Sequence, residues 1–473
     1  MKSSLKLLWL LWFLTSLIAA GFFVYMLLGK VDSSLLMPGP LSDGHHQLAD
    51  SCESCHTDAL GGGEVLQQAC IECHGDIRKK PFDSHPPAKF TDPRNADRLE
   101  KINALACVSC HSEHKPELTG VNGLTQPRDL CVHCHDDVAK ERPSHKDMEF
   151  STCTDSGCHN FHDNRALYTN FLIKHLHEED TRKPAKAKLL SREFGNSLMD
   201  LTSYPHARYP VRQLTMGDAD APKKAMKYEA TYRGWLETAH AKSGVNCSAC
   251  HQPLDEKGKP SAWTDFPGTR SCATCHDLES KRFGEGKHGM RLKAGLSPMT
   301  PADARLPMKK SAAHNQLTCL TCHATHEFNV VEAAVEACLG CHNDKHSLSY
   351  KSSSHYKLWM QSVSGEIPAD SGVSCASCHM PRINFDVNDW VSRIMVDHNQ
   401  SANFSPNSKM IRSSCIKCHG LPFTLDSLAD RDLIEQNFNS RPMVHIETME
   451  LVEQDQKRRQ KQSGGDNGGM FGF

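Results

Sequence analysis

All 22 cysteines of this 473-residue chain fall into eleven pairs, and a histidine directly follows each pair. Ten pairs have two residues between the cysteines, and the fifth pair has four. Because no cysteine is left over, whatever the motifs bind must govern how the chain folds. We number the motifs 1 to 11 in chain order: Cys52/Cys55–His56, Cys70/Cys73–His74, Cys107/Cys110–His111, Cys131/Cys134–His135, Cys153/Cys158–His159, Cys247/Cys250–His251, Cys272/Cys275–His276, Cys319/Cys322–His323, Cys338/Cys341–His342, Cys375/Cys378–His379 and Cys415/Cys418–His419.

The C-x-x-C-H pattern is the attachment signal of c-type haem. The two thiols form thioethers with the vinyl groups of one porphyrin, and the histidine binds the iron axially. The longer spacing of motif 5 still spans the same two vinyl groups. A single motif could also be a redox dithiol or half a zinc site, but zinc ribbons and disulfide scaffolds need no histidine after each pair. We therefore expect eleven haem c groups per chain, held by all 22 cysteines, with the motif histidines as proximal ligands.

A low-spin electron-transfer haem needs a second axial ligand, and 29 − 11 = 18 histidines remain to supply it. Three motifs continue as C-H-x-x-H, whose second histidine cannot reach the opposite face of the same iron, so we expect it to bind a neighbouring haem. The expected distal ligands are His46 (or His45), His85, His114, His145 and His162 in the first half, and His240, His288, His314, His326, His355 and His398 in the second. His133, His175, His177, His206, His346 and His445 are left as spares.

An ordinary side-chain core would be thin in this protein. Aromatic residues make up 7% of the chain, and no Trp or Tyr occurs between Leu41 and Arg165. Such a stretch cannot easily bury enough side-chain area to offset its ordering entropy. We expect a mostly α fold with extensive loops, little or no β structure and a haem-packed core. The net charge of −2 gives no reason to expect nucleic acid as a partner.

The N-terminal segment has Lys2 and Lys6 around the start of an apolar run from Leu7 to Leu28. As a helix this run rises about 33 Å, enough to cross a bilayer. It is longer than the roughly 7–15 apolar residues of a signal peptide. We expect an uncleaved single-pass anchor in a bacterial inner membrane, with cleavage after Ala20 as the alternative. The lysines place the N-terminus in the cytoplasm and the haem segments in the periplasm, where covalent haem attachment occurs.

The spacing of the motifs divides the chain into two groups. We expect an anchor with a cytoplasmic stub at 1–30, a linker at 31–44, a five-haem module at 45–165, a linker region at 166–227, a six-haem module at 228–425 and a C-terminal segment at 426–473. A helix at about Ala225–Ala241 should lead into motif 6. The charged and then Gly-rich residues from about Gln454 are typical of a disordered tail.

Two resemblances to known families follow from these motifs. Leu41 to Arg165 resembles the class III cytochromes c in motif density, in the C-x-x-x-x-C-H variant and in the missing aromatics, which implies closely spaced haems with two histidine ligands each. Tyr228 to Leu421 resembles the hydroxylamine oxidoreductase and pentahaem nitrite reductase superfamily. The residues that carry this second resemblance are Trp235–His240 before Val245-Asn246-Cys247, Lys287-His288-Gly289, and motif 10 with Met380-Pro381.

The second resemblance implies the fold and an electron-transfer role more than catalysis. Those nitrite reductases commonly have lysine in place of one motif histidine, and this chain has none. A catalytic haem in that superfamily keeps an open iron site, whereas every haem here has a candidate distal histidine.

The expected function is electron transfer from the inner membrane, from the quinol pool or a quinol dehydrogenase, to periplasmic or outer-membrane cytochromes. The alternative is an oxidoreductase acting on a small nitrogen or sulfur compound at one open-site haem, which Tyr350 and Tyr356 could line. A subunit of a larger redox complex is a third possibility. Whether the chain is an enzyme stays open, and no catalytic residue is assigned.

Overall fold

The computed structural model describes residues 2–28, 37–58, 61–75, 84–120, 123–154, 161–162, 167–183, 212–225, 228–255, 258–388, 391–403 and 406–465. Contacts along the chain divide it into two compact units. Unit 1 is Met1–Cys73 with Leu99–Pro127, and unit 2 is His74–Arg98 with Arg128–Phe473. The division falls within α2 (Gly63–His74) and α3 (Ala96–Lys101). The module boundaries expected from motif spacing stay a prediction.

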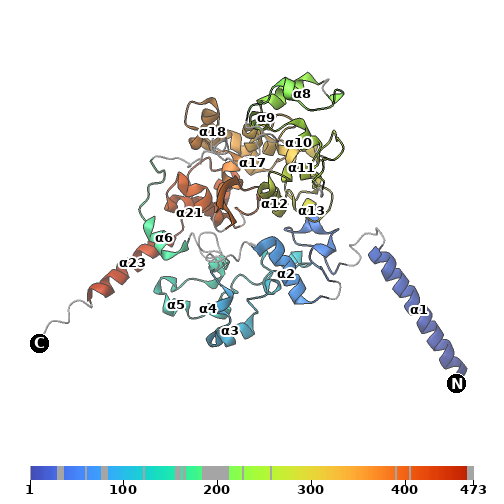
Figure 1. The fold of residues 1–473 in the computed structure, drawn as a ribbon. Helices are drawn as coiled ribbons and strands as arrows, with labels where there is room; N and C mark the ends of the chain where they lie inside the picture. Colours follow the sequence, from blue (N-terminus) through green and yellow to red (C-terminus); the bar gives the residue numbers. More distant parts are fainter. Residues whose placement is uncertain are drawn as a thin grey trace. The chain divides into compact units, whose positions relative to one another are not determined.

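The secondary structure is mostly helical, as predicted, and most helices are only one or two turns long (Figure 1). Unit 1 contains α1 (Lys2–Leu28), most of α2 and short 3-10 turns such as η3 (Cys52–Ser54) and η7 (Cys107–Ser109). The described residues of unit 2 form α4 (Val132–His135), α5 (Val138–Glu141), α6 (Thr169–Lys174), α8 (Glu229–Glu237), α9 (Ala239–Lys242), α10 (Cys247–His251), α11 (Thr269–Ala273), α12 (Asp277–Glu285), α13 (Met290–Lys293), α14 (Cys319–Cys322), α15 (Val330–Ala334), α16 (Glu336–Leu339), α17 (Lys345–Ser349), α18 (Ser354–Ser364), α19 (Cys375–His379), α20 (Met410–Ser413), α21 (Leu421–Ala429), α22 (Arg431–Glu435) and α23 (Thr448–Gly465).

Helix α1 is long and apolar enough to cross a membrane over Leu5–Tyr25, and none of that stretch is buried in the protein. Its length and composition fit the membrane segment predicted from the sequence.

The helix expected at Ala225–Ala241 forms as two pieces, α8 and α9. Thr238 separates them, because its backbone is extended and its side chain accepts a hydrogen bond from the Ala241 N–H at 3.2 Å. Threonine is a favoured N-cap residue, so α9 begins as a new helix just before motif 6.

Buried apolar side chains are scarce in the region of motifs 1 to 4. Among the described residues between 37 and 154, Ala69, at 6% exposure, is the single buried apolar side chain. A folded segment of this length needs far more buried apolar area. The interior is therefore incomplete without a large apolar group, in line with the haem-packed core expected from composition.

The largest side-chain core lies in unit 2 and joins two distant parts of the chain. Leu167 and Leu172 pack with residues of α20 and α21, including Ile411 and Leu425, and with Met449 of α23. Residues 167–176 fall in the predicted linker region, yet they belong to this core.

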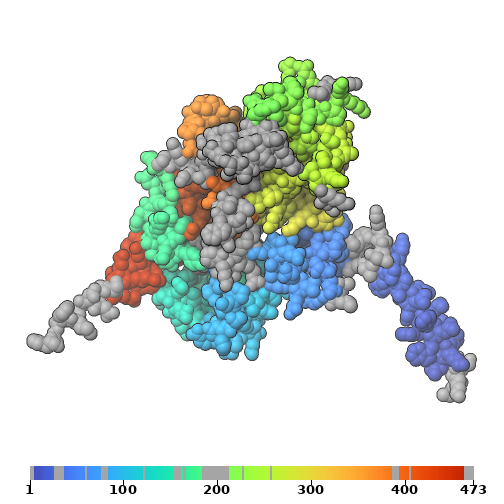
Figure 2. Space-filling model, viewed as in Figure 1, coloured from blue at the N-terminus to red at the C-terminus, as the bar shows by residue number. Residues whose placement is uncertain are grey.

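The C-terminal segment differs from the expected disordered tail. Helix α23 continues from Thr448 to Gly465, past Gln454 where the tail was expected to begin. It contacts α6 and the 3-10 turn η10 (Pro143–His145), and Figure 2 shows the red α23 against the green segment that includes α6. Tertiary contacts therefore stabilise a helix that its polar composition alone does not predict.

The strand content is small in the described residues of unit 2. Strands β1 (Arg382–Asn388) and β2 (Val391–Val396) form an antiparallel hairpin in which Arg382 lies opposite Val396. The end of β2 is fixed by a buried ion pair, since Arg282 of α12 donates to both carboxylate oxygens of Asp397 at 2.9 and 2.8 Å. The hairpin thereby positions His398.

The packing of α21 predicts a stability difference between two leucines. Leu425 is 1% exposed, so Leu425→Ala should destabilise the haem-loaded protein by about 2–5 kcal/mol through lost transfer energy and a cavity. Leu348, at 52% exposure on α17, is the control, and Leu348→Ala should change stability by less than about 0.5 kcal/mol. Urea unfolding followed by circular dichroism measures both, and equal midpoints for the two variants would contradict the assigned core.

Candidate functional site

The motifs that the structure describes adopt one helical turn each. In motifs 1, 3, 4, 7, 8, 9 and 11 the N–H of the histidine donates to the carbonyl of the first cysteine, at 2.8–3.0 Å. Motifs 6 and 10 are the short helices α10 and α19. Residues i, i+3 and i+4 lie on the same side of a helical turn, so the two thiols and the imidazole face one direction. This is the arrangement needed to hold one porphyrin edge and its iron.

The second cysteines of motifs 4 and 7 are placed by the backbone of their turns. The N–H of Cys134 donates to the Cys131 carbonyl, and that of Cys275 donates to the Cys272 carbonyl, both at 3.2 Å. Cys134 is partly buried and Cys275 is exposed. A thioether joins only the edge of a porphyrin, and that edge can lie at the protein surface. Haem attachment at Cys134 and Cys275 therefore stays a prediction from the motif.

No disulfide joins the cysteines of the described residues. Nor does any group of three or more His, Cys, Asp and Glu side chains there form a site for a metal ion. The zinc-ribbon and disulfide-scaffold alternatives therefore have no candidate site in that part of the chain. Cys158 and His159 of motif 5 lie outside the described residues, as does the spare His206.

A second imidazole faces each of seven motif histidines in unit 2. The two histidines of each pair come from different segments of the chain. The distances between ring centres are 5.9–6.3 Å in all seven cases. The pairs, each with its motif histidine first, are His135 with His85, His251 with His326, His276 with His240, His323 with His398, His342 with His288, His379 with His346, and His419 with His355.

This separation fits a metal ion between the rings. A histidine nitrogen lies about 2.0–2.1 Å from a bound transition metal and about 1.1 Å from its own ring centre, so two trans imidazoles have centres roughly 6 Å apart. Rings in direct van der Waals stacking would be much closer. The residues present therefore fit an iron ligated by two histidines at each of these seven motifs.

The Nδ1 atoms of many of these rings are tied to backbone carbonyls, which leaves Nε2 to face the metal. The partners are Thr264 for His251 at 2.6 Å, Asp180 for His419 at 3.0 Å, Phe161 for His85 at 2.7 Å, Ile434 for His346 at 2.5 Å and Val396 for His398 at 2.9 Å. A hydrogen bond at the second ring nitrogen is typical of metal-binding histidines, since it fixes the tautomer and the ring orientation.

Burial keeps several of these imidazoles neutral. It lowers the pKa of His288, His355 and His379 to about 4. A neutral ring retains the nitrogen lone pair that a metal needs, so these three side chains are suitable ligands at neutral pH.

In the described residues, some of the predicted distal ligands lie opposite a motif histidine and others do not. Six candidates (His85, His240, His288, His326, His355 and His398) stand opposite a motif histidine. His314 makes no ring contact or hydrogen bond with the part of the chain that the structure describes. His346 takes a place opposite His379 instead, although the sequence analysis leaves it as a spare.

The assignment of His346 has no signal in the sequence. It follows motif 9 closely, but its approach to motif 10 depends on α17 packing against α22. The carbonyl of Ile434 at the end of α22 then holds the Nδ1 atom of His346.

Two of the three C-H-x-x-H units share a backbone feature. His114 and His326, the second histidines of the units at motifs 3 and 8, have left-handed backbones with φ of 62° and 63°. This conformation is uncommon for a residue with a side chain, though histidine is among the more tolerant types. It turns the ring of His326 away from motif 8 and toward His251 of motif 6, in the way expected for a ligand of another haem.

The remaining first-half candidates are fixed by local contacts. The Nδ1 atom of His46 lies 2.9 Å from the Asp43 carbonyl, and that of His114 lies 2.8 Å from the Gly39 carbonyl. The Nδ1 atom of His45 lies 2.7 Å from Glu113. His145 contacts Ser144, and His162 lies beside Phe161. Their roles as distal ligands stay predictions.

The two tyrosines considered for an open site have other partners. Tyr350 is 3% exposed, and its hydroxyl donates to the Val373 carbonyl at 2.6 Å. Its ring packs edge-on against Tyr356 in a core cluster with Val335 and Leu339. Both rings therefore have a packing role.

Motif 11 depends on the segment that follows motif 5. The N–H of Arg182 donates to the Cys418 carbonyl at 2.8 Å, and the Asp180 carbonyl accepts from His419. Gly420 permits this approach, because a Cβ there would lie 2.4 Å from the Glu179 carbonyl oxygen. The predicted linker region thus supplies part of a candidate haem site.

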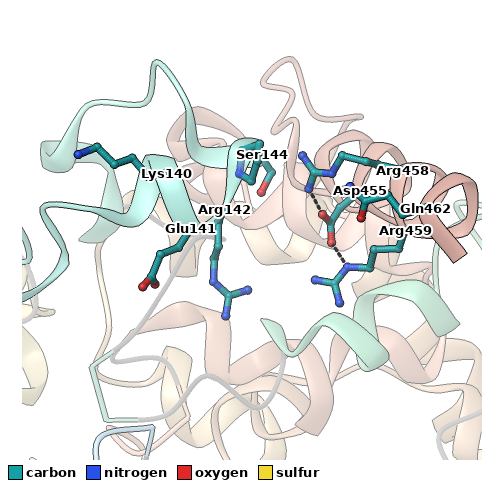
Figure 3. A pocket seen from close by; sticks show the side chains of 9 residues that line it. Lys140, Glu141, Arg142, Ser144, Asp455, Arg458, Arg459 and Gln462 are labelled. Atoms are coloured by element: carbon teal, nitrogen blue, oxygen red, sulfur yellow. Dashed lines mark hydrogen bonds and ion pairs between the residues drawn. The ribbon is translucent and has the colours of Figure 1, made fainter. Parts of the chain in front are cut away.

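A charged pocket lies between the η10 region and α23 (Figure 3). Asp455 stands between the guanidinium groups of Arg458 and Arg459, with Arg142 on the facing wall. Burial would raise the pKa of Asp455, but hydrogen bonds from the two arginines lower it below its ordinary value. The pocket borders Ser144, which contacts the candidate ligand His145.

Comparison with known proteins addresses the first part of the chain. Residues 44–136 match the family model for cytochrome c3. No solved structure matches the chain. The match covers motifs 1 to 4 and agrees with the resemblance to class III cytochromes c. Residues 44–136 are therefore similar to cytochrome c3, which implies covalently bound c-type haems and multihaem electron transfer in this part of the chain.

Proposed function

We propose that this protein transfers electrons through eleven covalently bound c-type haems, each with two histidine ligands where the chain supplies a partner. The observation that carries the proposal is the set of seven imidazole pairs at 5.9–6.3 Å, each with one motif histidine. A haem c supplies an iron that takes up and releases one electron. Two tightly held axial imidazoles leave no open site for a substrate, which favours transfer over catalysis.

The axial assignment follows from those pairs. His85, His326, His240, His398, His288, His346 and His355 serve as distal ligands for motifs 4 and 6 to 11 in that order. His46, His114, His145 and His162 remain the proposed distal ligands for the other motifs, as the sequence indicates.

Neighbouring motifs from 6 to 11 touch in chain order, which supports one continuous path through this part of unit 2. Helix α10 of motif 6 contacts α11 of motif 7, and α14 of motif 8 contacts α16 of motif 9. The sulfur atoms of Cys272 and Cys319 lie close together, which brings motifs 7 and 8 side by side. Cys375 of motif 10 packs on the core cluster beside motif 9. Ser414, next to motif 11, donates to the Ser377 carbonyl of motif 10 at 3.1 Å.

The same kind of contact occurs in unit 1. Gln67 of α2, near motif 2, accepts from the Cys107 N–H of motif 3 at 2.8 Å and donates to the Leu105 carbonyl at 3.1 Å. Because thioethers lie at the porphyrin edge, adjacent cysteines bring adjacent haem edges together. The chain thereby sets the short distances that electron transfer needs.

We propose the inner membrane as the place of action, with α1 as an uncleaved anchor and the haem segments in the periplasm. Electrons would then come from the quinol pool or a quinol dehydrogenase and leave to periplasmic or outer-membrane cytochromes. The apolar stretch Leu5–Tyr25 and the lysines near its start support this orientation.

Mass spectrometry of the intact purified protein tests the haem count. We expect the apoprotein mass plus eleven haems, because every cysteine belongs to an attachment motif. The double variant Cys153→Ser, Cys158→Ser should carry ten, since motif 5 keeps its attachment role despite its longer spacing. An identical haem content in the variant and the wild type would show that motif 5 binds no haem.

Low-temperature EPR of the ferric protein tests the axial assignment and the function together. The wild type should show only low-spin signals, whereas a high-spin signal would favour the oxidoreductase alternative. His346→Ala should convert one haem of the eleven to high spin, because it removes the ring opposite His379. His314→Ala is the matched control and should leave every haem low-spin. A high-spin haem in His314→Ala but not in His346→Ala would assign the distal position to His314.

Cell fractionation and N-terminal sequencing test the anchor. The full-length protein should remain in the membrane fraction after a high-salt wash, with Leu7 to Leu28 still present in the mature chain. Burial of this apolar helix in the bilayer is the physical reason, since salt screens only the electrostatic attachments. Recovery of a soluble haem protein that begins after Ala20 would identify the segment as a cleaved signal peptide.

A further inference from the structure

The seven imidazole pairs differ in the angle between their ring planes. Six pairs cross at 42–86°. The rings of His251 and His326, opposite each other at motif 6, are parallel to within 3°. A ring can rotate about its bond to a metal, so something in the chain must hold this orientation.

The loop after motif 6 holds the ring of His251 on two sides. The indole of Trp263 stacks on the imidazole, with ring centres 4.7 Å apart and planes at 8°. The next residue, Thr264, accepts the hydrogen bond from Nδ1 at 2.6 Å, and its own N–H donates to the His251 carbonyl at 2.9 Å. One contact fixes the face of the ring and the other fixes its edge.

The indole is itself anchored by a hydrogen bond. Its Nε1–H donates to Asp265 Oδ1 at 3.0 Å. The opposite ring belongs to His326, whose left-handed backbone at φ 63° sets its direction. The two parallel rings are therefore held from separate parts of unit 2.

We propose that Trp263 is a positioning residue that keeps the two axial imidazoles parallel at the haem of motif 6 and so gives this haem an electronic structure distinct from its neighbours. This inference rests on the proposed function, because it takes His251 and His326 as axial ligands. The π orbital of an imidazole is perpendicular to its ring. Two parallel rings therefore interact with the same iron d orbital, whereas crossed rings interact with two different d orbitals. Only parallel rings produce a large energy difference between the two d orbitals.

Aromatic stacking alone does not produce parallel ligands. Phe161 stacks on His85 at 4.1 Å and 2°, yet the planes of His85 and His135 cross at 75°. Phe423 stacks on His419 at 5.0 Å, in a pair that crosses at 71°. The effect of Trp263 comes from the match between its plane and that of the distal ring of His326. Phe423 also stacks on a motif histidine, but the distal ring there is crossed, so Phe423 serves as a control residue.

EPR of the ferric, haem-loaded protein tests the proposal, because strong orbital splitting gives a rhombic low-spin signal and weak splitting gives a strongly axial one. In Trp263→Leu we expect a loss of rhombic intensity equal to one haem and a matching gain of axial intensity, with the total low-spin count unchanged. Trp263→Phe, which keeps a flat ring, should retain the rhombic signal. Phe423→Leu should leave that signal as in the wild type.

Two results would overturn the proposal. A Trp263→Leu spectrum identical to the wild type would show that the indole does not set the ring plane. A new high-spin signal in that variant would show that Trp263 maintains the ligand bond and not its orientation. The variant His326→Ala tests separately whether His326 is an axial ligand. If His326→Ala shows no high-spin haem, His326 is not an axial ligand, and the proposed function itself fails at this motif.

Discussion

The structure of unit 2 depends on the approach of a second imidazole to seven motif histidines from other parts of the chain. In unit 2 such pairs draw α9 toward motif 7, the β hairpin toward motif 8 and α17 toward motif 10. Several of these rings, such as those of His398 and His346, are held at Nδ1 by a backbone carbonyl, which leaves Nε2 to face the gap. The short helices are therefore organised around the gaps between imidazoles and much less around contacts with one another.

The side-chain cores are correspondingly small and local. One joins the segment around Leu172 to α21 and α23, another surrounds Trp235 and Tyr232, and a third lies at Tyr350. Each adjoins a motif: Cys415 and Cys378 border the first, Cys247 the second and Cys375 the third. These cores hold the polypeptide beside the motifs and leave most of the interior to the proposed haems.

Contacts between distant segments also tune the individual sites. Motif 11 takes a carbonyl from Asp180, motif 10 takes a ring from His346, and motif 6 takes the stacked indole of Trp263. At the proposed haems, such contacts would orient the ligands and adjust a redox centre whose chemistry the cofactor itself supplies. Identical motifs can then carry haems with different properties along one path.

The sequence by itself determined the eleven Cys–His motifs, the helical and loop-rich character and the apolar N-terminal helix, because each depends on residues close together in the chain. It also indicated most of the distal candidates in unit 2, since they lie near motifs. Tertiary structure alone decided that His346 and not His314 approaches motif 10, that residues 167–182 pack on motif 11 and that α23 is ordered. These features arise from packing between segments more than 80 residues apart, such as His346 against Ile434, and no local pattern encodes them.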